Sequence, residues 1–209
     1  EIRAFVSQEY WSIDGKFSAN GERKTFAAKL NTVDGEKPEL INKEQADEIL
    51  KRLEGAEFVI DKVKKSVHRK SPAAPFTTST LQQEASRRLS FQARRTMKTA
   101  QELYEGVEIN DMGQTGLITY MRTDSVNLSD LALGTAKEAI FETYGEKYYK
   151  FRQYHTKSKG AQEAHEAIRP TYISNVEAGS SSQEKKLYEL IRKRTIACQM
   201  ADAELERTT

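Results

Sequence analysis

The stretch "TTSTLQQEASRRLSFQARRTMKTAQELYEG", residues 77–106, decides the fold of the chain. It begins with hydroxyl residues, and two pairs in it, Ser79 with Gln82 and Thr80 with Gln83, have the spacing of a capping box at a helix start. The helical pattern breaks in the middle of the stretch and resumes up to the final glycine. The stretch therefore predicts two helices joined by a short turn.

The residues that follow add a strand and further helices. "GLITY", residues 116–120, is typical of a strand, and two helices followed by a strand are compatible with a helix-turn-helix that carries a wing. This order is not specific, because many small helical domains contain it. Helical patterns return at residues 129–145, with Ser129 as the cap, and from Ser180 to about Gln199.

The amino-terminal part has the alternating pattern of a sheet. Short apolar and polar runs alternate within residues 1–34, and Asp14-Gly15 is a typical turn signal between them. A capped helix is expected over residues 42–55, and the strand pattern resumes over residues 56–70. This part therefore predicts an antiparallel sheet with one helix.

The composition indicates a well-solvated chain that can bury a core. Of its 209 residues 31% are charged and 37% hydrophobic, and no apolar run is long enough to cross a membrane. The net charge of +2 is too small to indicate a polyanionic partner, so only local clusters can do so. The single cysteine, Cys198, fits a core position in a reducing interior, and we expect a cytoplasmic protein without membrane contact.

The two ends of the sequence suggest a piece excised from a longer protein. The first residue is Glu1 instead of methionine, and no signal peptide is visible. The last residues, "LERTT", resemble the start of a strand.

The segment "ITYMRTDS", residues 118–125, places a phenol two residues from a guanidinium. In an extended strand Tyr120, Arg122 and Asp124 would project from one face. A phenol has a pKa of about 10, so a nucleophilic tyrosine needs nearby positive charge, which Arg122 could supply while it also holds a phosphate. The alternative from spacing alone is an ordinary half-buried aromatic, with the arginine paired to Asp124.

A run of cations without an intervening acid lies in the predicted helix pair. Its members are Arg87, Arg88, Arg94, Arg95 and Lys98. Together with the hydroxyl residues at the first helix start, Thr80 among them, they are a candidate contact for a phosphate backbone. The alternative is that they pair with nearby glutamates, namely Glu84, Glu102 and Glu105.

The segment "AHEAIRP", residues 164–170, contains another candidate pair. His165 and Arg169 could present a second phosphate-binding pair from one helical turn, although a lone histidine more often has a structural role. No histidine and cysteine cluster has zinc spacing, and neither a phosphate loop nor Asp-x-Asp occurs. The sequence therefore predicts no metal site in this chain.

Three segments together resemble the bacterial type IA DNA topoisomerases. They are "APFTTSTLQQEASRRL" at 74–89, "GLITYMRTDSVNLS" at 116–129 and "AQEAHEAIRPT" at 161–171. The resemblance covers nearly the whole chain, and the order of tyrosine, arginine and aspartate is its most specific part. It implies an α+β fold in which a mostly helical, winged-helix-like domain is inserted into a strand-rich arch domain.

The resemblance also divides the chain. Residues 75–174 would form the domain with the active tyrosine, and residues 1–74 plus 175–209 the arch, which acts as a hinge. Pro72 and Pro75 interrupt regular structure at the first of these boundaries. The segment before the tyrosine is longer than in some family members, so its loop is expected to differ in shape.

The resemblance implies a role for each residue that matches a functional position of the family. Tyr120 corresponds to the nucleophile that attacks single-stranded DNA and forms a 5′-phosphotyrosine link, and Arg122 to the arginine at the scissile phosphate. His165 corresponds to a histidine at the DNA backbone near the cut, and Asp124 to the aspartate of the motif. The further expected DNA contacts are Arg169, Arg94, Arg95 and Thr80.

The resemblance implies a partner and a cofactor as well. The whole enzyme would act as a monomer on single-stranded and negatively supercoiled DNA and relax it. Its Mg²⁺ would be held by an amino-terminal domain that this chain lacks, so the 209 residues alone are expected to be inactive. Two alternatives are a non-catalytic winged-helix DNA-binding module, in which Tyr120 packs in the core, and a scaffold with negligible DNA affinity of its own.

Overall fold

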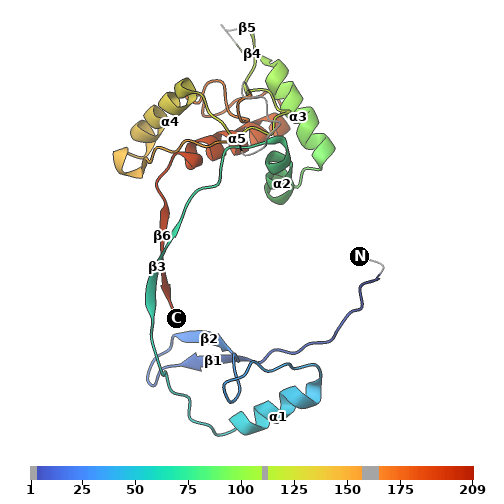
Figure 1. Cartoon of the computed structure of the whole chain (residues 1–209), viewed down its shortest axis with the longest axis vertical. Coiled ribbons are helices and arrows are strands. Elements are labelled where there is room, and N and C mark those ends of the chain that lie inside the picture. Colours follow the sequence, from blue (N-terminus) through green and yellow to red (C-terminus); the bar gives the residue numbers. More distant parts are fainter. Residues whose placement is uncertain (1–3, 110–112, 157–164) are drawn as a thin grey trace. The chain divides into compact units, whose positions relative to one another are not determined.

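The structure, a computed structural model, describes residues 4–109, 113–156 and 165–209. Packing divides the chain into two compact units, residues 1–63 and residues 64–209, and each is described by itself. Both units contain helices and strands (Figure 1), which confirms the expected α+β class. No helix in the described ranges is long and apolar enough to cross a membrane.

The first unit contains a two-stranded hairpin. Strand β1 (Asp14–Ser18) pairs antiparallel with β2 (Thr25–Lys29), and the centroids of the stacked Phe17 and Phe26 rings lie 5.8 Å apart. The turn predicted at Gly15 and its preceding aspartate is wrong, because both residues are paired within β1. A Cβ atom at Gly15 would lie 2.5 Å from the Phe17 ring, so this glycine makes room for an aromatic and does not bend the chain.

Helix α1 (Lys43–Leu53) lies within the range that the sequence predicts. The Asn42 side chain accepts a hydrogen bond from the Gln45 N–H at 3.0 Å, which satisfies an amide that the first turn leaves free. The strand expected over residues 56–70 is confirmed only at its end, as β3 (Lys65–Lys70). The preceding residues of that stretch lie outside any strand.

Strand β3 finds its partner at the far end of the sequence. It pairs antiparallel with β6 (Ala203–Thr208), with Val67 opposite Glu206. This confirms the strand that the last residues suggest. Most side chains of both strands are exposed, so the ladder of backbone hydrogen bonds, and not a buried face, holds the pair together.

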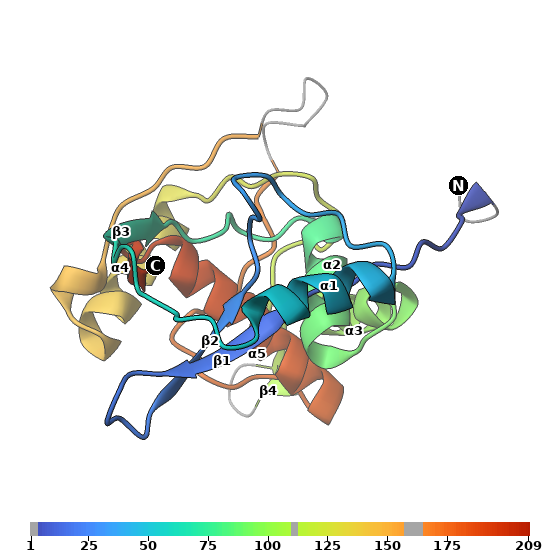
Figure 2. The ribbon, with the colours of Figure 1, turned by 90° about the horizontal axis from the view of Figure 1, so that it is seen from below.

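Three helices form the centre of the second unit: α2 (Thr78–Leu89), α3 (Ala93–Glu105) and α5 (Ser182–Cys198). They pack against one another (Figure 2), and α4 (Asp130–Thr143) packs against α5. The fully buried apolar side chains of this core include Leu81, Leu103 and Ile191. All four helices lie at the positions that the sequence predicts.

The helix ends show which local signals were informative. The capping pairs predicted at Ser79 and Thr80 are wrong, because Thr77 is still extended, with φ −95° and ψ 171°, and is the cap of α2. Thr80 completes a reciprocal capping box with it. The predicted cap of α4, Ser129, is confirmed, and Cys198 is buried at the end of α5.

A short hairpin follows α3, just before the strand that the sequence predicts over residues 116–120. It consists of β4 (Val107–Ile109) and β5 (Gly113–Thr115). The segment expected to differ in shape from some family members spans residues 106–116, and residues 110–112 of it lie outside the described residues. The strand predicted over residues 116–120 is wrong, since the segment makes only an isolated bridge from Ile118. The neighbours of this segment are irregular segments instead of strands.

The expected functional division stays a prediction. It groups residues 175–209 with residues 1–74, whereas α5 packs against α2 and α3 inside the second unit. A unit defined by packing and a part that moves need not share boundaries, because a hinge lies wherever the chain absorbs the change in backbone angles.

Candidate active site

Three irregular segments meet in the second unit: the residues before α2, residues 116–125 and residues 165–171. Phe76 forms an isolated backbone bridge with Ile168, and Ile118 forms another with Pro170. The side chains of Phe76, Ile118 and Ile168 are at most 1% exposed. These apolar residues hold the three segments against the helical core.

Residues 120–124 alternate between exposed and buried side chains. Tyr120, Arg122 and Asp124 are exposed, whereas Met121 and Thr123 are buried. Tyr120, Arg122 and Asp124 therefore share the exposed side of the segment, as an extended backbone predicts, although the segment is not part of a strand. Tyr120 is 43% exposed, which does not fit the alternative in which it packs in the core.

Thr78 anchors the chain just after Tyr120. Its hydroxyl lies 2.8 Å from the carbonyl oxygen of Met121, to which it donates, and it accepts a hydrogen bond from the N–H of Thr123 at 2.9 Å. The N–H of Thr78 also donates to the carbonyl of Thr123 at 2.9 Å. One hydroxyl at the start of α2 therefore fixes the backbone that carries Arg122.

Thr119 anchors the chain just before Tyr120. Its hydroxyl donates to the carbonyl of Ala167 at 2.7 Å and accepts from the N–H of Arg169 at 2.9 Å. Its own N–H donates to the carbonyl of Arg169 at 2.9 Å. The backbone of Tyr120 thus lies between two anchored residues.

Arg122, Asp124 and His165 open onto one shallow depression of about 550 Å³. Residues 77–79 at the start of α2 complete its lining. The Arg122 guanidinium and the His165 imidazole supply donors, and the start of α2 adds partial positive charge, so the depression suits a phosphate. The N–H groups of Thr77 and Thr78 are already bonded, to the Thr80 hydroxyl and to the Thr123 carbonyl. Among the described residues no ion pair joins Arg122 to Asp124, which leaves the guanidinium available.

Tyr120 and Thr80 do not line this depression. The Tyr120 ring meets the Tyr104 ring edge to face, with centroids 5.3 Å apart and an interplanar angle of 67°. Thr80 is occupied in the capping box of α2. Sequence reasoning missed Tyr104, and no local signal could have found it, because the contact joins the end of α3 to a segment beyond the hairpin.

Arg169 lies elsewhere than expected. Residues 165–171 are not helical, so His165 and Arg169 are not presented from one turn. The Arg169 guanidinium binds both carboxylate oxygens of Glu166, at 2.7 Å and 3.2 Å, and its side chain is only 13% exposed. Burial opposes ionisation of Glu166, but hydrogen bonds from Arg169 and Ser129 outweigh it and lower the pKa of this carboxyl.

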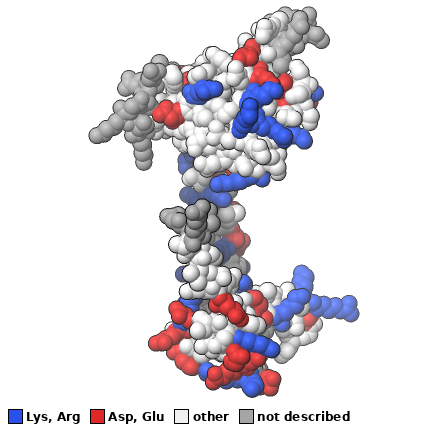
Figure 3. Space-filling view, turned by 90° about the vertical axis from the view of Figure 1, so that its right-hand side faces the viewer, with Lys and Arg blue, Asp and Glu red and all other residues white. Residues whose placement is uncertain are grey.

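The run of cations in α2 and α3 divides into two groups. Arg87 and Arg88 pair with Glu84, at 3.7 Å and 2.5 Å, and Lys98 pairs with Glu102 at 3.8 Å. Arg94 and Arg95 are exposed and form no ion pair within the described part of the chain. The pairing with glutamates is therefore confirmed for part of the run, and a phosphate contact by Arg94 and Arg95 stays a prediction. On the face that Figure 3 shows, Lys and Arg side chains gather in patches on the second unit.

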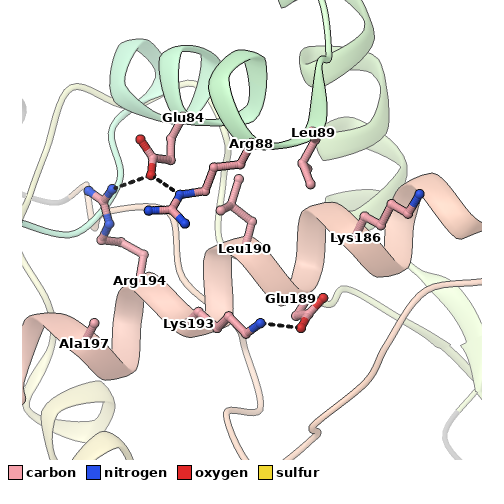
Figure 4. Close-up of a pocket in the computed structure, with 9 residues that line it drawn as sticks. All are labelled: Glu84, Arg88, Leu89, Lys186, Glu189, Leu190, Lys193, Arg194 and Ala197. Carbon is pink, nitrogen blue, oxygen red and sulfur yellow. Dashed lines mark hydrogen bonds and ion pairs between the residues drawn. The ribbon is translucent and has the colours of Figure 1, made fainter. Parts of the chain in front are cut away.

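A groove of about 300 Å³ between α2 and α5 has a different character (Figure 4). Glu84 lies between Arg88 and Arg194, whose guanidinium is 3.8 Å from the carboxylate. Arg194 also donates to the carbonyl of Ala74 at 3.2 Å and lies 4.2 Å from the centroid of the Phe76 ring. These contacts join α5 to α2 and to the segment before it, which is a structural role.

None of the described residues forms a cluster of three or more histidine, cysteine, aspartate or glutamate side chains that could hold a metal ion. Asp124, the acid at the depression, has a basic arginine and histidine beside it in the lining. The described side chains therefore do not fit a divalent cation.

Known proteins are similar to this chain over nearly its full length. A family model described as "DNA topoisomerase" matches residues 1–209. The DNA topoisomerase 1 of Rickettsia felis is 47% identical over 211 residues, and that of Rickettsia typhi is 45% identical over 209 residues. Each alignment covers 96% of this chain and 27% of the relative, so the chain spans little more than a quarter of their length.

A solved structure of full-length topoisomerase I from Thermotoga maritima is similar over 99% of this chain and 32% of its own, with a TM-score of 0.76 and 37% identity. Fold, sequence and family model thus agree. The chain belongs to the DNA topoisomerase family, in its bacterial type IA group.

Proposed function

We propose that Tyr120 is the nucleophile with which the whole protein cuts and rejoins one DNA strand, and that this cycle relaxes negative supercoils. The observation that carries the proposal is an exposed phenol on a backbone anchored on both sides, next to a depression that presents Arg122 and His165. Membership in the DNA topoisomerase family supports it.

In the proposed reaction the phenolic oxygen of Tyr120 attacks phosphorus and forms a 5′-phosphotyrosine bond. The bond from phosphorus to the 3′ oxygen breaks, the phenol loses a proton and the departing 3′ oxygen gains one. Arg122 stabilises the negative charge that grows on the phosphate oxygens. Because one phosphodiester replaces another, the reverse attack reseals the strand without a nucleotide cofactor.

The other polar residues of the site would bind the DNA. His165 and the start of α2 border the depression, where they can orient a phosphate next to Arg122. Asp124 also lines the depression and remains a proposed DNA contact, but its carboxylate only accepts hydrogen bonds and would not bind the phosphate itself. Arg94 and Arg95, at the start of α3, are proposed as further contacts for the DNA backbone. Arg169 and Thr80 also remain proposed DNA contacts, but each would have to release its present partner to bind.

We propose single-stranded segments of negatively supercoiled DNA as the substrate of the whole protein, which acts as a monomer in the cytoplasm. The metal of the family is proposed to be Mg²⁺, held by residues other than those of this chain, because the described side chains do not fit it. Residues 1–74 and 175–209 are proposed to belong to the arch that opens a gate for the passing strand.

The decisive experiment removes the hydroxyl group of Tyr120 from the whole protein. Tyr120→Phe should abolish the covalent protein–DNA adduct on a single-stranded oligonucleotide, with magnesium supplied, because the nucleophile is gone. Non-covalent binding, measured by gel shift, should stay within about twofold, because Arg122 and His165 remain. Tyr144→Phe is the matched control and should form the adduct normally, since Tyr144 is 48% exposed at the end of α4. An adduct that persists in Tyr120→Phe would overturn the proposal.

A further inference from the structure

The Tyr120 side chain has one described aromatic neighbour, Tyr104, which also lies at the surface. Tyr104 is 42% exposed and Tyr120 43%, and their rings meet edge to face with centroids 5.3 Å apart. Aromatic pairs prefer this arrangement, because the positive edge of one ring meets the negative face of the other. The contact therefore favours one orientation of the Tyr120 side chain, although it lies outside the hydrophobic core.

Tyr104 is itself firmly placed with respect to Tyr120. It is the second-last residue of α3, and the preceding Leu103 is fully buried and accepts a hydrogen bond from the Leu117 N–H at 2.8 Å. A Cβ atom at Gly116 would lie 2.8 Å from the carbonyl oxygen of Tyr104, so only a glycine lets the two backbones approach this closely. The end of α3 and the segment leading to Tyr120 are thus in fixed register.

The anchors at Thr78 and Thr119 fix the backbone around Tyr120 but not its ring. Two side-chain torsions remain, and no described hydrogen bond involves the Tyr120 hydroxyl. We propose that Tyr104 is a positioning residue, whose ring edge contact holds the Tyr120 side chain in the orientation from which its oxygen reaches the DNA phosphate. This inference rests on the proposed function of Tyr120.

A positioning role predicts a specific pattern among Tyr104 variants of the whole protein. Tyr104→Phe keeps the ring and should form the covalent adduct at a rate within about twofold of the original protein. Tyr104→Ala and Tyr104→Leu remove the aromatic contact and should slow adduct formation roughly tenfold at saturating single-stranded DNA, because a misplaced reacting atom reduces the rate strongly. The dissociation constant for the same DNA should stay within about twofold.

Three controls distinguish a positioning role of Tyr104 from a variant that fails to fold and from a wrong assignment of the nucleophile. Tyr144→Ala removes a comparably exposed tyrosine at the end of another helix and should leave the adduct rate unchanged. Melting temperatures identify any variant that fails to fold, and Tyr104→Leu, which keeps an apolar helix-forming side chain, then replaces the alanine variant. Tyr120→Phe tests the proposed function itself, independently of Tyr104.

Two results would overturn the proposed positioning role. If Tyr120→Phe abolishes the adduct while folded Tyr104→Ala and Tyr104→Leu form it at the original rate, then Tyr104 does not position the nucleophile. If these variants instead weaken DNA binding and leave the rate at saturation unchanged, then Tyr104 contacts the DNA and not Tyr120. An adduct that survives Tyr120→Phe rejects the proposed function, which is a different outcome.

Discussion

At the scale of single residues, the carboxylate of Glu166 joins two elements next to the candidate site. It accepts hydrogen bonds from the Arg169 guanidinium and, at 2.7 Å, from the backbone N–H of Ser129, the cap of α4. Its side chain is 28% exposed, so the pair is only partly screened by water. Arg169, expected as a DNA contact, therefore has a structural partner in the absence of DNA.

The direction of the pKa shift of Glu166 predicts how this interaction depends on pH. The folded protein lowers the pKa of Glu166 from its ordinary value of 4.5, so the ionised carboxylate is the stabilising form. The stabilisation should be complete above the ordinary value and lost as the pH falls through the lowered one. Glu166→Gln should destabilise the protein by roughly 1–2 kcal/mol at neutral pH, and the difference should shrink below a pH of about 4.

Thermal unfolding between neutral and acidic pH measures this difference. The matched control is Glu189→Gln, because the Glu189 and Lys193 side chains are 55% and 71% exposed and such surface pairs contribute little. Equal destabilisation by both substitutions, or a Glu166→Gln difference that grows at low pH, would contradict the assignment.

At the scale of elements, the site is built from the junction between a helix start and an irregular segment. Thr78, the first residue of α2, binds the backbone on the far side of Tyr120, while Thr119 binds the segment that contains His165 and Arg169. Hydroxyl groups can donate and accept at once, so one threonine satisfies backbone groups of both orientations. The irregular segment is thereby anchored on both sides of Tyr120.

Removal of one of these hydroxyls should loosen the segment. Thr78→Val leaves the N–H of Thr123 without its partner and should destabilise the protein by roughly 1–3 kcal/mol. It should also slow adduct formation, because Arg122 lies between the two carbonyls that Thr78 contacts. Thr78→Ser retains the hydroxyl and should recover most of both losses. Melting temperature and adduct rate are the two readouts, and a valine variant equal to the original protein would show that the anchor is dispensable.

At the scale of the whole molecule, the near-neutral charge of +2 conceals separate local distributions. Ion pairs with Glu84 neutralise part of the positive charge of α2, whereas Arg94 and Arg95 at the start of α3 face solvent without a carboxylate partner among the described residues. Neither arginine would have to break an ion pair to neutralise a phosphate, although the Arg95 guanidinium lies 5.7 Å from the centroid of the Phe91 ring. These two arginines are therefore the better candidates for electrostatic DNA binding.

Salt titration of DNA binding by the whole protein tests this distinction. If both arginines touch phosphate, replacing Arg94 and Arg95 with alanine should reduce the slope of log binding constant against log salt by roughly 1.4 for single-stranded DNA. Replacing Arg87 and Arg88 should change the slope less, because both are already paired with Glu84. An unchanged slope in the first variant would assign Arg94 and Arg95 to solvent alone.

The sequence by itself determined the features that arise within a few neighbouring residues. The helices at α1, α2, α3, α4 and α5 follow from caps and periodicity, and the alternation of Tyr120, Arg122 and Asp124 follows from an extended backbone. The burial of Cys198 follows from its place in an apolar helix face. Each of these signals lies within one helix or one short extended segment.

Only the tertiary structure decided which distant segments meet. The pairing of β3 with β6, the contact of Tyr104 with Tyr120 and the ion pair that holds Arg169 could not be read from local patterns, and the strand predicted over residues 116–120 is replaced by bridges and threonine anchors. The physical reason is that such contacts form between residues brought together by burial of the shared core. Local propensity does not encode their partners.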